Sequence, residues 1–386
     1  MVLGARRSRA TLVALGGAGA IATAVFACST FGDEDDTERD PDAAPADVVA
    51  DAPTADGAAD APPEAEPPSV VAPACPRPKP LDCIASGCIA EELYRPLPGA
   101  QAFPFAIATD SRSIFWIEQG QRDGAGLARV LRISKAGGPV AVLATDQPSA
   151  TAIAVMGDHV YWGAANELRR VERTCTAPCK IEIRADAPTA RHIAPAGPDA
   201  LMLLAGDGTL RRHRVDTAGV AVVPISSVGT NNFLATGASE NVAAGFTVDT
   251  IVVAPFAGTP VVRTITPPRD AGDKGFPIVG SDCKSYVGIG GSDSSLYKID
   301  LDGKTSPLQN IIEGNGSPYG IAADDGVFYV AFANNGGLYA VNPDAKSAMR
   351  IAEGDIWRLT TDADGIYWGT HENGPGAGRL FRIRRK

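Results

Sequence analysis

The stretch GIAADDGVFYV at residues 320–330, followed after a short loop by GLYAV at residues 337–341, is the clearest copy of a pattern that recurs along this chain. Each copy contains a run of small residues, an Asp/Gly turn, an aromatic run and an alternating apolar–polar run. Three further good copies begin at Ala106, Ala152 and Arg358, and three weaker ones begin at Ile193, Leu234 and Ile278. Such repetition constrains the fold more than any other feature of the sequence.

The spacing of the copies predicts four short strands in each repeat. Asn342-Pro343-Asp344 is a typical turn into a fourth strand around Ile351. Four strands in about 40 residues, repeated, are typical of a β-propeller. We therefore predict an all-β, seven-bladed β-propeller with four antiparallel strands per blade; a β-sandwich or a β-solenoid is the alternative. The apolar residues that anchor the seven copies lie 38–46 residues apart, at Ile107, Ile153, Ile193, Leu234, Ile278, Ile321 and Leu359.

The last repeat has no fourth strand of its own, because the chain ends at Lys386 soon after LFRI at residues 380–383. We expect residues 91–97 to supply this strand and to pair antiparallel with residues 380–383. Pro96 fits such a place, since an outer strand has one edge without partners. An N-terminal strand in the last blade would then close the ring.

The aromatic pair after the Asp-containing turn resembles the repeats of the Tyr-Trp-Thr-Asp (YWTD) and NHL propellers. YWG at residues 161–163 and at residues 367–369 comes nearest, although neither copy continues with Thr-Asp. The resemblance covers residues 104–386 and implies a propeller, usually of six blades in the animal relatives. It implies no active site, because one fold serves many functions.

Residues 1–27 have the features of an export signal. Arg6, Arg7 and Arg9 precede an apolar run at residues 11–26, which is shorter than the stretch of about 20 residues that a transmembrane helix needs. The run ends in VFAC at residues 25–28, which resembles the lipobox of bacterial lipoproteins, although Phe26 is bulkier than that family usually carries. The resemblance implies that Cys28 carries acyl chains such as palmitate and anchors the protein in a membrane. An ordinary secretory signal cleaved near Ala27 is the alternative.

In lipoprotein families, Ser29 after the modified cysteine implies sorting to the outer membrane of a host with two membranes. We therefore expect a cell-envelope protein, an outer-membrane lipoprotein on the periplasmic or the outer surface.

Residues 28–74 are expected to form a disordered, lipid-anchored tether. Residues 29–74 are rich in Ala, Pro and Asp and hold 13 acidic residues and one Arg, a net charge of −12. Such a segment buries too little apolar surface to offset its conformational entropy, and its like charges repel. The whole chain carries −10 and the leader +3, so residues 75–386, the expected propeller with its closing segment 75–100, carry only −1. This balance gives no sign of nucleic-acid binding.

Six cysteines follow Cys28, and an even number in an exported protein indicates disulfides. Cys83 with Cys88 and Cys175 with Cys179 occupy equivalent turns between third and fourth strands, and we predict a local bridge in each. Cys75 and Cys283 form a third pair only by elimination. The spacings and the lack of nearby histidines do not suit a zinc site.

We predict no catalytic residues, metal or cofactor. Asp300 to Gly303 and Asp362 to Gly365 resemble the openings of calcium loops, but Gln309 and His371 stand where a bidentate Glu is needed, so turns are expected. Propellers usually bind ligands where one blade crosses to the next, just before each anchor residue. The polar and aromatic residues at those places form a candidate binding rim of Arg191, His192, Asn232, Tyr319, Trp357 and Arg358. The alternative is that these aromatics pack between blades and the polar residues are merely solvated.

Two functions remain open at this point. The first is a monomeric binding or scaffolding module, lipid-anchored at the cell envelope, for a protein or glycan partner. The second is a propeller enzyme, a lactonase-like hydrolase or a lyase, with its pocket at the channel mouth. The expected mouth positions contain no Asp or Glu, which favours the first function.

Overall fold

The computed structural model shows that residues Ser69–Lys386 form a compact unit. Cys28, Cys75, Asn232, Cys283 and the predicted leader and tether lie outside the residues that the structure describes. The described residues are 81, 83–84, 87–97, 102–120, 127–186, 190–215, 223–227, 233–236, 240–244, 250–255, 261–264, 280–281, 285–290, 295–300, 305–307, 318–324, 327–332, 336–342, 346–371 and 378–386.

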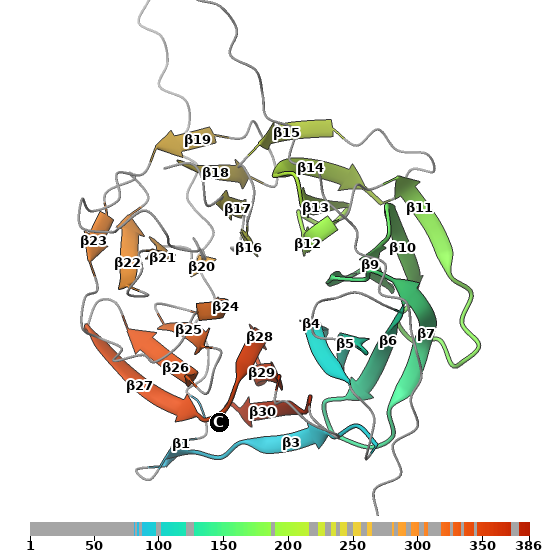
Figure 1. Ribbon diagram of the computed structural model, residues 1–386, viewed down its shortest axis with the longest axis horizontal. Coiled ribbons are helices and arrows are strands. Elements are labelled where there is room, and N and C mark those ends of the chain that lie inside the picture. The colour runs from blue at the N-terminus through green and yellow to red at the C-terminus, as the bar shows by residue number, and fades with distance from the viewer. Residues whose placement is uncertain are drawn as a thin grey trace, which may run out of the picture. The chain divides into compact units, whose positions relative to one another are not determined.

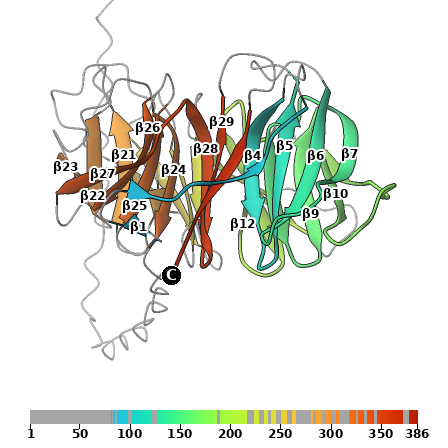
Figure 2. The ribbon, with the colours of Figure 1, turned by 90° about the horizontal axis from the view of Figure 1, so that it is seen from below.

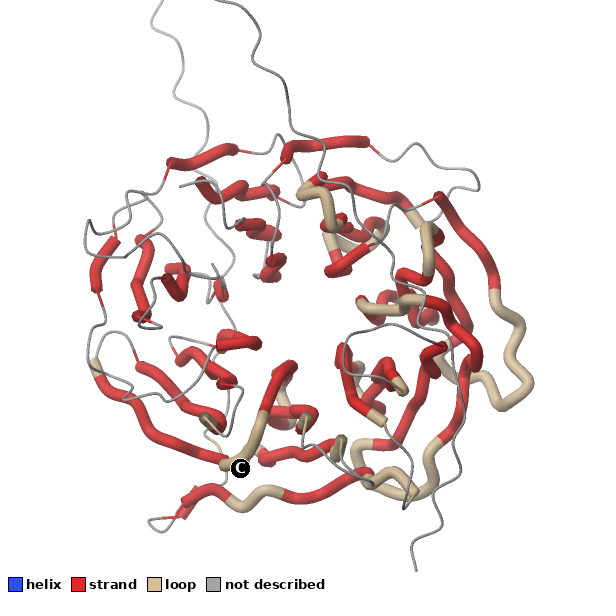
Figure 3. Tube along the Cα trace, in the orientation of Figure 1, coloured by secondary structure: helices blue, strands red, loops and turns tan. Residues whose placement is uncertain are grey.

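Antiparallel sheets of four strands are arranged around a common axis in this unit (Figures 1 and 3). Figure 2 shows that the strands run roughly along that axis. Seven such sheets lie in the described part of the chain. The first strands contact one another in succession, and the first strand of the last sheet also contacts that of the first sheet. The prediction of an all-β fold of four-stranded antiparallel sheets is confirmed.

Six of the sheets are built from consecutive strands, whose order in the sheet is their order in the chain. The first three comprise β4 (Phe103–Thr109), β5 (Ser113–Gln119), β6 (Leu127–Ser134) and β7 (Ala141–Pro148); β8 (Ala152–Met156), β9 (His159–Ala164), β10 (Glu167–Glu172) and β11 (Glu182–Asp186); and β12 (Ala190–Pro195), β13 (Ala200–Ala205), β14 (Thr209–Arg214) and β15 (Val223–Ser227). The next three comprise β16 (Phe233–Thr236), β17 (Glu240–Ala244), β18 (Thr250–Pro255) and β19 (Val261–Thr264); β20 (Gly280–Ser281), β21 (Ser285–Gly290), β22 (Ser295–Asp300) and β23 (Thr305–Pro307); and β24 (Pro318–Asp324), β25 (Val327–Phe332), β26 (Gly337–Asn342) and β27 (Ser347–Ala352).

The remaining sheet, here called the β3 sheet, joins the two ends of the described chain. It has the order β28 (Ile356–Asp362), β29 (Gly365–Thr370), β30 (Leu380–Arg384) and β3 (Glu91–Tyr94). Glu91 lies opposite Arg382 in the antiparallel register, and β3 runs along β30 in Figure 1. The strand ends before Pro96, where we had expected it to continue to residue 97, because proline has no N–H with which to extend a ladder.

The aromatic residues of the second strands fill the space between neighbouring sheets. Trp116, Trp162 and Trp368 are essentially inaccessible to water. The glycine after each YW pair explains why the motif here is YWG. A Cβ atom on Gly163 would lie 2.9 Å from Cβ of Ala190, and one on Gly369 would lie 2.6 Å from Cβ of Pro104. A small residue there lets the first strand of the next sheet approach closely.

Arginines join successive sheets at one recurring place, the carbonyl group directly after the third strand. Arg382 donates to the Lys135 carbonyl, Arg132 to the Arg173 carbonyl and Arg184 to the Val215 carbonyl. The first of these bonds connects the β3 sheet to the β4–β7 sheet. The same two sheets are joined by Lys135, whose Nζ lies 2.7 Å from carboxylate oxygens of Asp362 and Asp364.

Both predicted short disulfides are present. Cys83 and Cys88 bridge a hairpin of β1 (Cys83–Ile84) and β2 (Gly87–Cys88), directly before β3. Cys175 and Cys179 are bridged between β10 and β11. In the part of the chain that the structure describes, no helix has the length and apolar character needed to cross a membrane.

Candidate functional site

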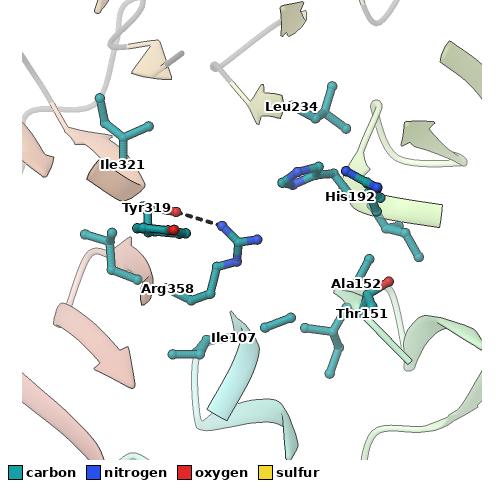
Figure 4. Close-up of a pocket in the computed structure, with 14 residues that line it drawn as sticks. Ile107, Thr151, Ala152, His192, Leu234, Tyr319, Ile321 and Arg358 are labelled. Carbon is teal, nitrogen blue, oxygen red and sulfur yellow. Dashed lines mark hydrogen bonds between the residues drawn. The ribbon is translucent and has the colours of Figure 1, made fainter. Parts of the chain in front are cut away.

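A pocket of about 170 Å³ opens where the first strands converge (Figure 4). Its lining comes from β4, β8, β12, β16, β24 and β28, so six sheets contribute to one site. Its polar side chains belong to Thr151 and to four of the predicted rim residues. Two of these four, Arg191 and Arg358, are arginines and carry positive charge. The lining residues are Ala106, Ile107, Thr151, Ala152, Ile153, Arg191, His192, Ile193, Leu234, Tyr319, Gly320, Ile321, Arg358 and Leu359.

Arg358 extends from β28 toward the middle of the pocket and is held in place on two sides. One guanidinium nitrogen donates to the Tyr319 carbonyl at 2.7 Å, and the guanidinium carbon lies 5.5 Å from the centre of the Phe105 ring. Burial lowers the pKa of Arg358 to about 10; the Tyr319 phenol opposes this change, and the charge of Arg191 adds to it. The guanidinium therefore remains a cation at neutral pH.

Arg191 and His192 enter the pocket from β12. Figure 4 shows the His192 ring and the Arg358 guanidinium pointing toward each other across the pocket. Arg191 is exposed to the channel, and its side chain lies over Gly206, where a Cβ atom would come within 3.2 Å of its Nε. The missing side chain at Gly206 thus leaves room for Arg191. The site has positive charge on two non-adjacent sheets.

A stack of four rings forms the wall behind Tyr319. The ring centres of Tyr319 and Trp357 are 4.4 Å apart, those of Trp357 and His371 are 4.2 Å apart, and those of His371 and Phe103 are 4.6 Å apart. The Trp357 indole donates to Asp355 Oδ1 at 2.9 Å, and the backbone N–H of His371 donates to the Asp355 carbonyl at 2.7 Å. This network fixes the orientation of the Tyr319 ring.

The structure brings four of the six predicted rim residues, Arg191, His192, Tyr319 and Arg358, into one pocket. Trp357 stacks on Tyr319 of the neighbouring sheet, the kind of packing that the alternative interpretation describes. Asn232 lies outside the described residues. Sequence reasoning missed His371 and Phe103 as parts of the wall. They are far apart in the chain and share no motif, so no local signal marked them.

The second suspected calcium loop is a turn. Asp362 Oδ1 accepts hydrogen bonds from the backbone N–H groups of Asp364 and Gly365, while Lys135 pairs with both carboxylates. The loop after Asp300 lies outside the described residues. Among the residues that are described, no group of three or more His, Cys, Asp or Glu side chains is placed to hold a metal ion.

Comparison with known proteins shows similarity of structure only. No protein-family model and no curated protein sequence matches the chain. A catalytically inactive virginiamycin B lyase from Staphylococcus aureus with quinupristin superposes with a TM-score of 0.58 at 12% identity, over 77% of this chain and 99% of the lyase. YCF48 bound to a peptide gives 0.54 at 11% identity, over 80% of this chain and 100% of YCF48.

The WD40 β-propeller domain of Doa1 gives a TM-score of 0.55 at 12% identity, over 78% of this chain and 97% of that domain. At identities this low, the comparisons establish the fold and not the activity. The chain therefore has the fold of a β-propeller.

Proposed function

We propose that this protein is a binding or scaffolding module that recognises a protein or glycan partner at the mouth of its propeller channel. The observation that carries this proposal is the pocket at the convergence of the first strands, where Arg191, His192 and Arg358 meet. Rigid strands hold these side chains, and a pre-formed concave site with a few convergent polar groups is the usual form of a binding site.

We further propose that the ring has seven blades and that β3 closes it. The seven four-stranded sheets, the β3–β30 register and the contact between β28 and β4 support this arrangement. A ring closed in this way would hold the two arginines at a constant separation, because neither β12 nor β28 could move without breaking contacts on both sides.

We also propose that a lipid anchor and a tether hold this module at the cell envelope. The support comes from the positive leader, the apolar run and Cys28, followed by the acidic segment at residues 29–74. Cys28→Ala should release the protein from the membrane into the soluble fraction of its host, because the acyl chains that hold it would be lost. If the variant stayed in the membrane fraction, the anchor would be wrong.

Photo-crosslinking tests the binding face. A photoreactive azidophenylalanine in place of Tyr319 would sit in the pocket wall with little change of shape. The matched control carries the same group in place of Met349, which is 50% exposed on the outer strand β27. We expect position 319 to crosslink a discrete envelope protein or glycan in intact cells, and position 349 not to do so.

Two results would count against a binding module. One is equal crosslinking from both positions, since that would indicate non-specific contact. The other is turnover of lactone or ester substrates by the purified protein that is lost in a pocket variant, since that would favour the propeller enzyme.

A further inference from the structure

Two guanidinium groups share the pocket, although the sheets that carry them are not neighbours. Arg191 comes from β12 and Arg358 from β28, and the β4 and β8 strands lie between them around the axis. In the described part of the chain, neither side chain has a carboxylate partner. The two like charges are close enough for Arg191 to oppose the protonation of Arg358. Such an arrangement is unfavourable until an anion joins it.

The pocket holds these charges ready for a ligand. Arg358 is fixed by the Tyr319 carbonyl and the Phe105 ring, and Gly206 leaves room for Arg191. Arg358 is already oriented in this way and therefore loses little conformational freedom when a ligand arrives. A guanidinium group presents paired N–H donors that match the oxygens of a carboxylate or a phosphate.

The size of the pocket limits what can enter. A cavity of about 170 Å³ has room for a small head group. The Tyr319–Trp357–His371–Phe103 stack makes one wall rigid, so the pocket cannot widen there without breaking ring contacts. Only the end of a larger ligand could therefore reach both arginines.

We propose that the channel mouth is an oxyanion site, in which Arg191 and Arg358 together bind a terminal carboxylate or phosphate group of the partner. This inference rests on the proposed binding function and names the chemical group that the site recognises. His192 and Thr151 border the same space and would contact the remainder of the head group.

Titration calorimetry on the full chain tests the site, with sodium acetate, inorganic phosphate and neutral acetamide as probes in a buffer free of other oxyanions. We expect saturable binding of at least one anion and none of acetamide. Arg191→Gln and Arg358→Gln should each weaken that binding by about tenfold or more, because each removes a charge-assisted hydrogen-bonding group. Binding of acetate alone would identify a carboxylate ligand, and binding of phosphate alone a phosphate ester.

Controls separate a local effect from a general one. Arg112→Gln removes a positive charge from an exposed turn away from the pocket and should leave the affinity unchanged. Arg191 is exposed, so its variant should fold normally even if Arg358→Gln is destabilised. The melting temperature of each variant, and its rise with anion concentration in the wild type, gives a second measure of binding.

The inference is overturned if neither anion binds the wild type, or if Arg112→Gln weakens binding as much as Arg191→Gln. If neither anion binds while position 319 still crosslinks its partner, the binding module stands and the oxyanion site is wrong.

Discussion

The β8–β11 sheet and the β3 sheet have the same plan but are assembled from the chain in different ways. Both carry YWG on the second strand and a short disulfide shortly before the fourth strand. Both pair an arginine of the third strand with a glutamate directly opposite on the fourth, Arg170 with Glu182 and Arg382 with Glu91. In the first sheet the fourth strand follows the third after a short loop. In the second, the paired residues are 291 positions apart.

The comparison shows which contacts hold β3 against β30, two strands that no short loop connects. A short loop keeps β11 near β10 at little entropic cost, whereas β3 must be held by its contacts alone. Its glutamate accordingly contacts two arginines: Glu91 lies 2.6 Å from Arg382 and 2.8 Å from Arg384. Arg382 is also more buried than Arg170, with 6% of its side chain exposed compared with 16%. The pairing of β3 with β30 is therefore where we expect the propeller to be most sensitive to change.

Removal of the closing strand should have the largest effect. Deletion of residues 75–98 takes away β3, its disulfide hairpin and Glu91, and leaves β30 with an open edge. We expect the melting temperature to fall by about 10 °C or more, because several kcal/mol of contacts are lost. Deletion of residues 29–74 is the control and should change it little. Small, equal effects of the two deletions would contradict the proposed closure.

Packing between the β3 sheet and the β4–β7 sheet can be tested with one methyl group. Gly369→Ala would place Cβ 2.6 Å from Cβ and 2.9 Å from the carbonyl oxygen of Pro104, so the β3 and β4–β7 sheets must separate. We expect a loss of about 2 kcal/mol. The matched Gly163→Ala should cost about 1 kcal/mol, because its contact with the Ala190 side chain is 2.9 Å. Chemical denaturation of both variants measures the difference, and a larger loss for Gly163→Ala would reverse our ranking of the two interfaces.

The two disulfides close loops of similar length and should contribute about 2 kcal/mol each on the chain-entropy model. We expect replacement of Cys83 and Cys88 by serine to lower stability more than replacement of Cys175 and Cys179, because the first bridge also anchors the start of β3. Thermal denaturation gives the comparison. Peptide mapping without reduction should recover each wild-type pair as one intact loop, and free thiols at these positions would show that the bridges do not form.

The smallest expected effect is that of removing the carboxylate charge of Glu91 or of Glu182. Burial raises the pKa of Glu91, but hydrogen bonds from Arg382 and Arg384 lower it by more, so the pKa lies below its ordinary value. Its stabilising contribution should be complete at neutral pH and be lost as the pH falls through the folded-state pKa. Glu91→Gln should cost about 1 kcal/mol at pH 7, with Glu182→Gln costing less.

The pH dependence supplies the check on this prediction. The difference in melting temperature between the wild type and Glu91→Gln should shrink as the pH falls below about 4 and vanish once the pH is below the folded-state pKa of Glu91. A difference that stayed constant down to pH 3 would show that the charge of Glu91 is not what holds β3.

The strong repeats could be located from sequence to within a few residues. The aromatic runs at residues 114–116, 160–162 and 366–368 all lie in second strands. The weak repeats carry less periodic signal, because they are rich in small and polar residues, but their anchors Ile193 and Leu234 also lie in first strands, β12 and β16. Ile278, the expected anchor of another first strand, lies outside the described residues, and the described part of the first strand in that sheet is Gly280–Ser281.

The candidate site was predictable in its residues but not in its geometry. The repeat register placed Arg191, His192, Tyr319 and Arg358 at equivalent positions, and equivalent positions in a propeller converge on one axis. Nothing local indicated that Arg358 would reach the Tyr319 carbonyl, or that His371 and Phe103 would extend the Tyr319–Trp357 stack.

The all-β class, the four-strand repeat, the two short disulfides and the positions at the mouth could all be inferred from the sequence alone. These depend on periodicity and spacing, which are properties of neighbouring residues. Other features emerge only in the folded protein: Glu91 pairs with Arg382 and Arg384, and two cations share one pocket. The arginines that join sheets through the carbonyls of residues 135, 173 and 215 belong to the same group. Such contacts join residues far apart in the chain, so the energies that select them arise only once the strands are packed.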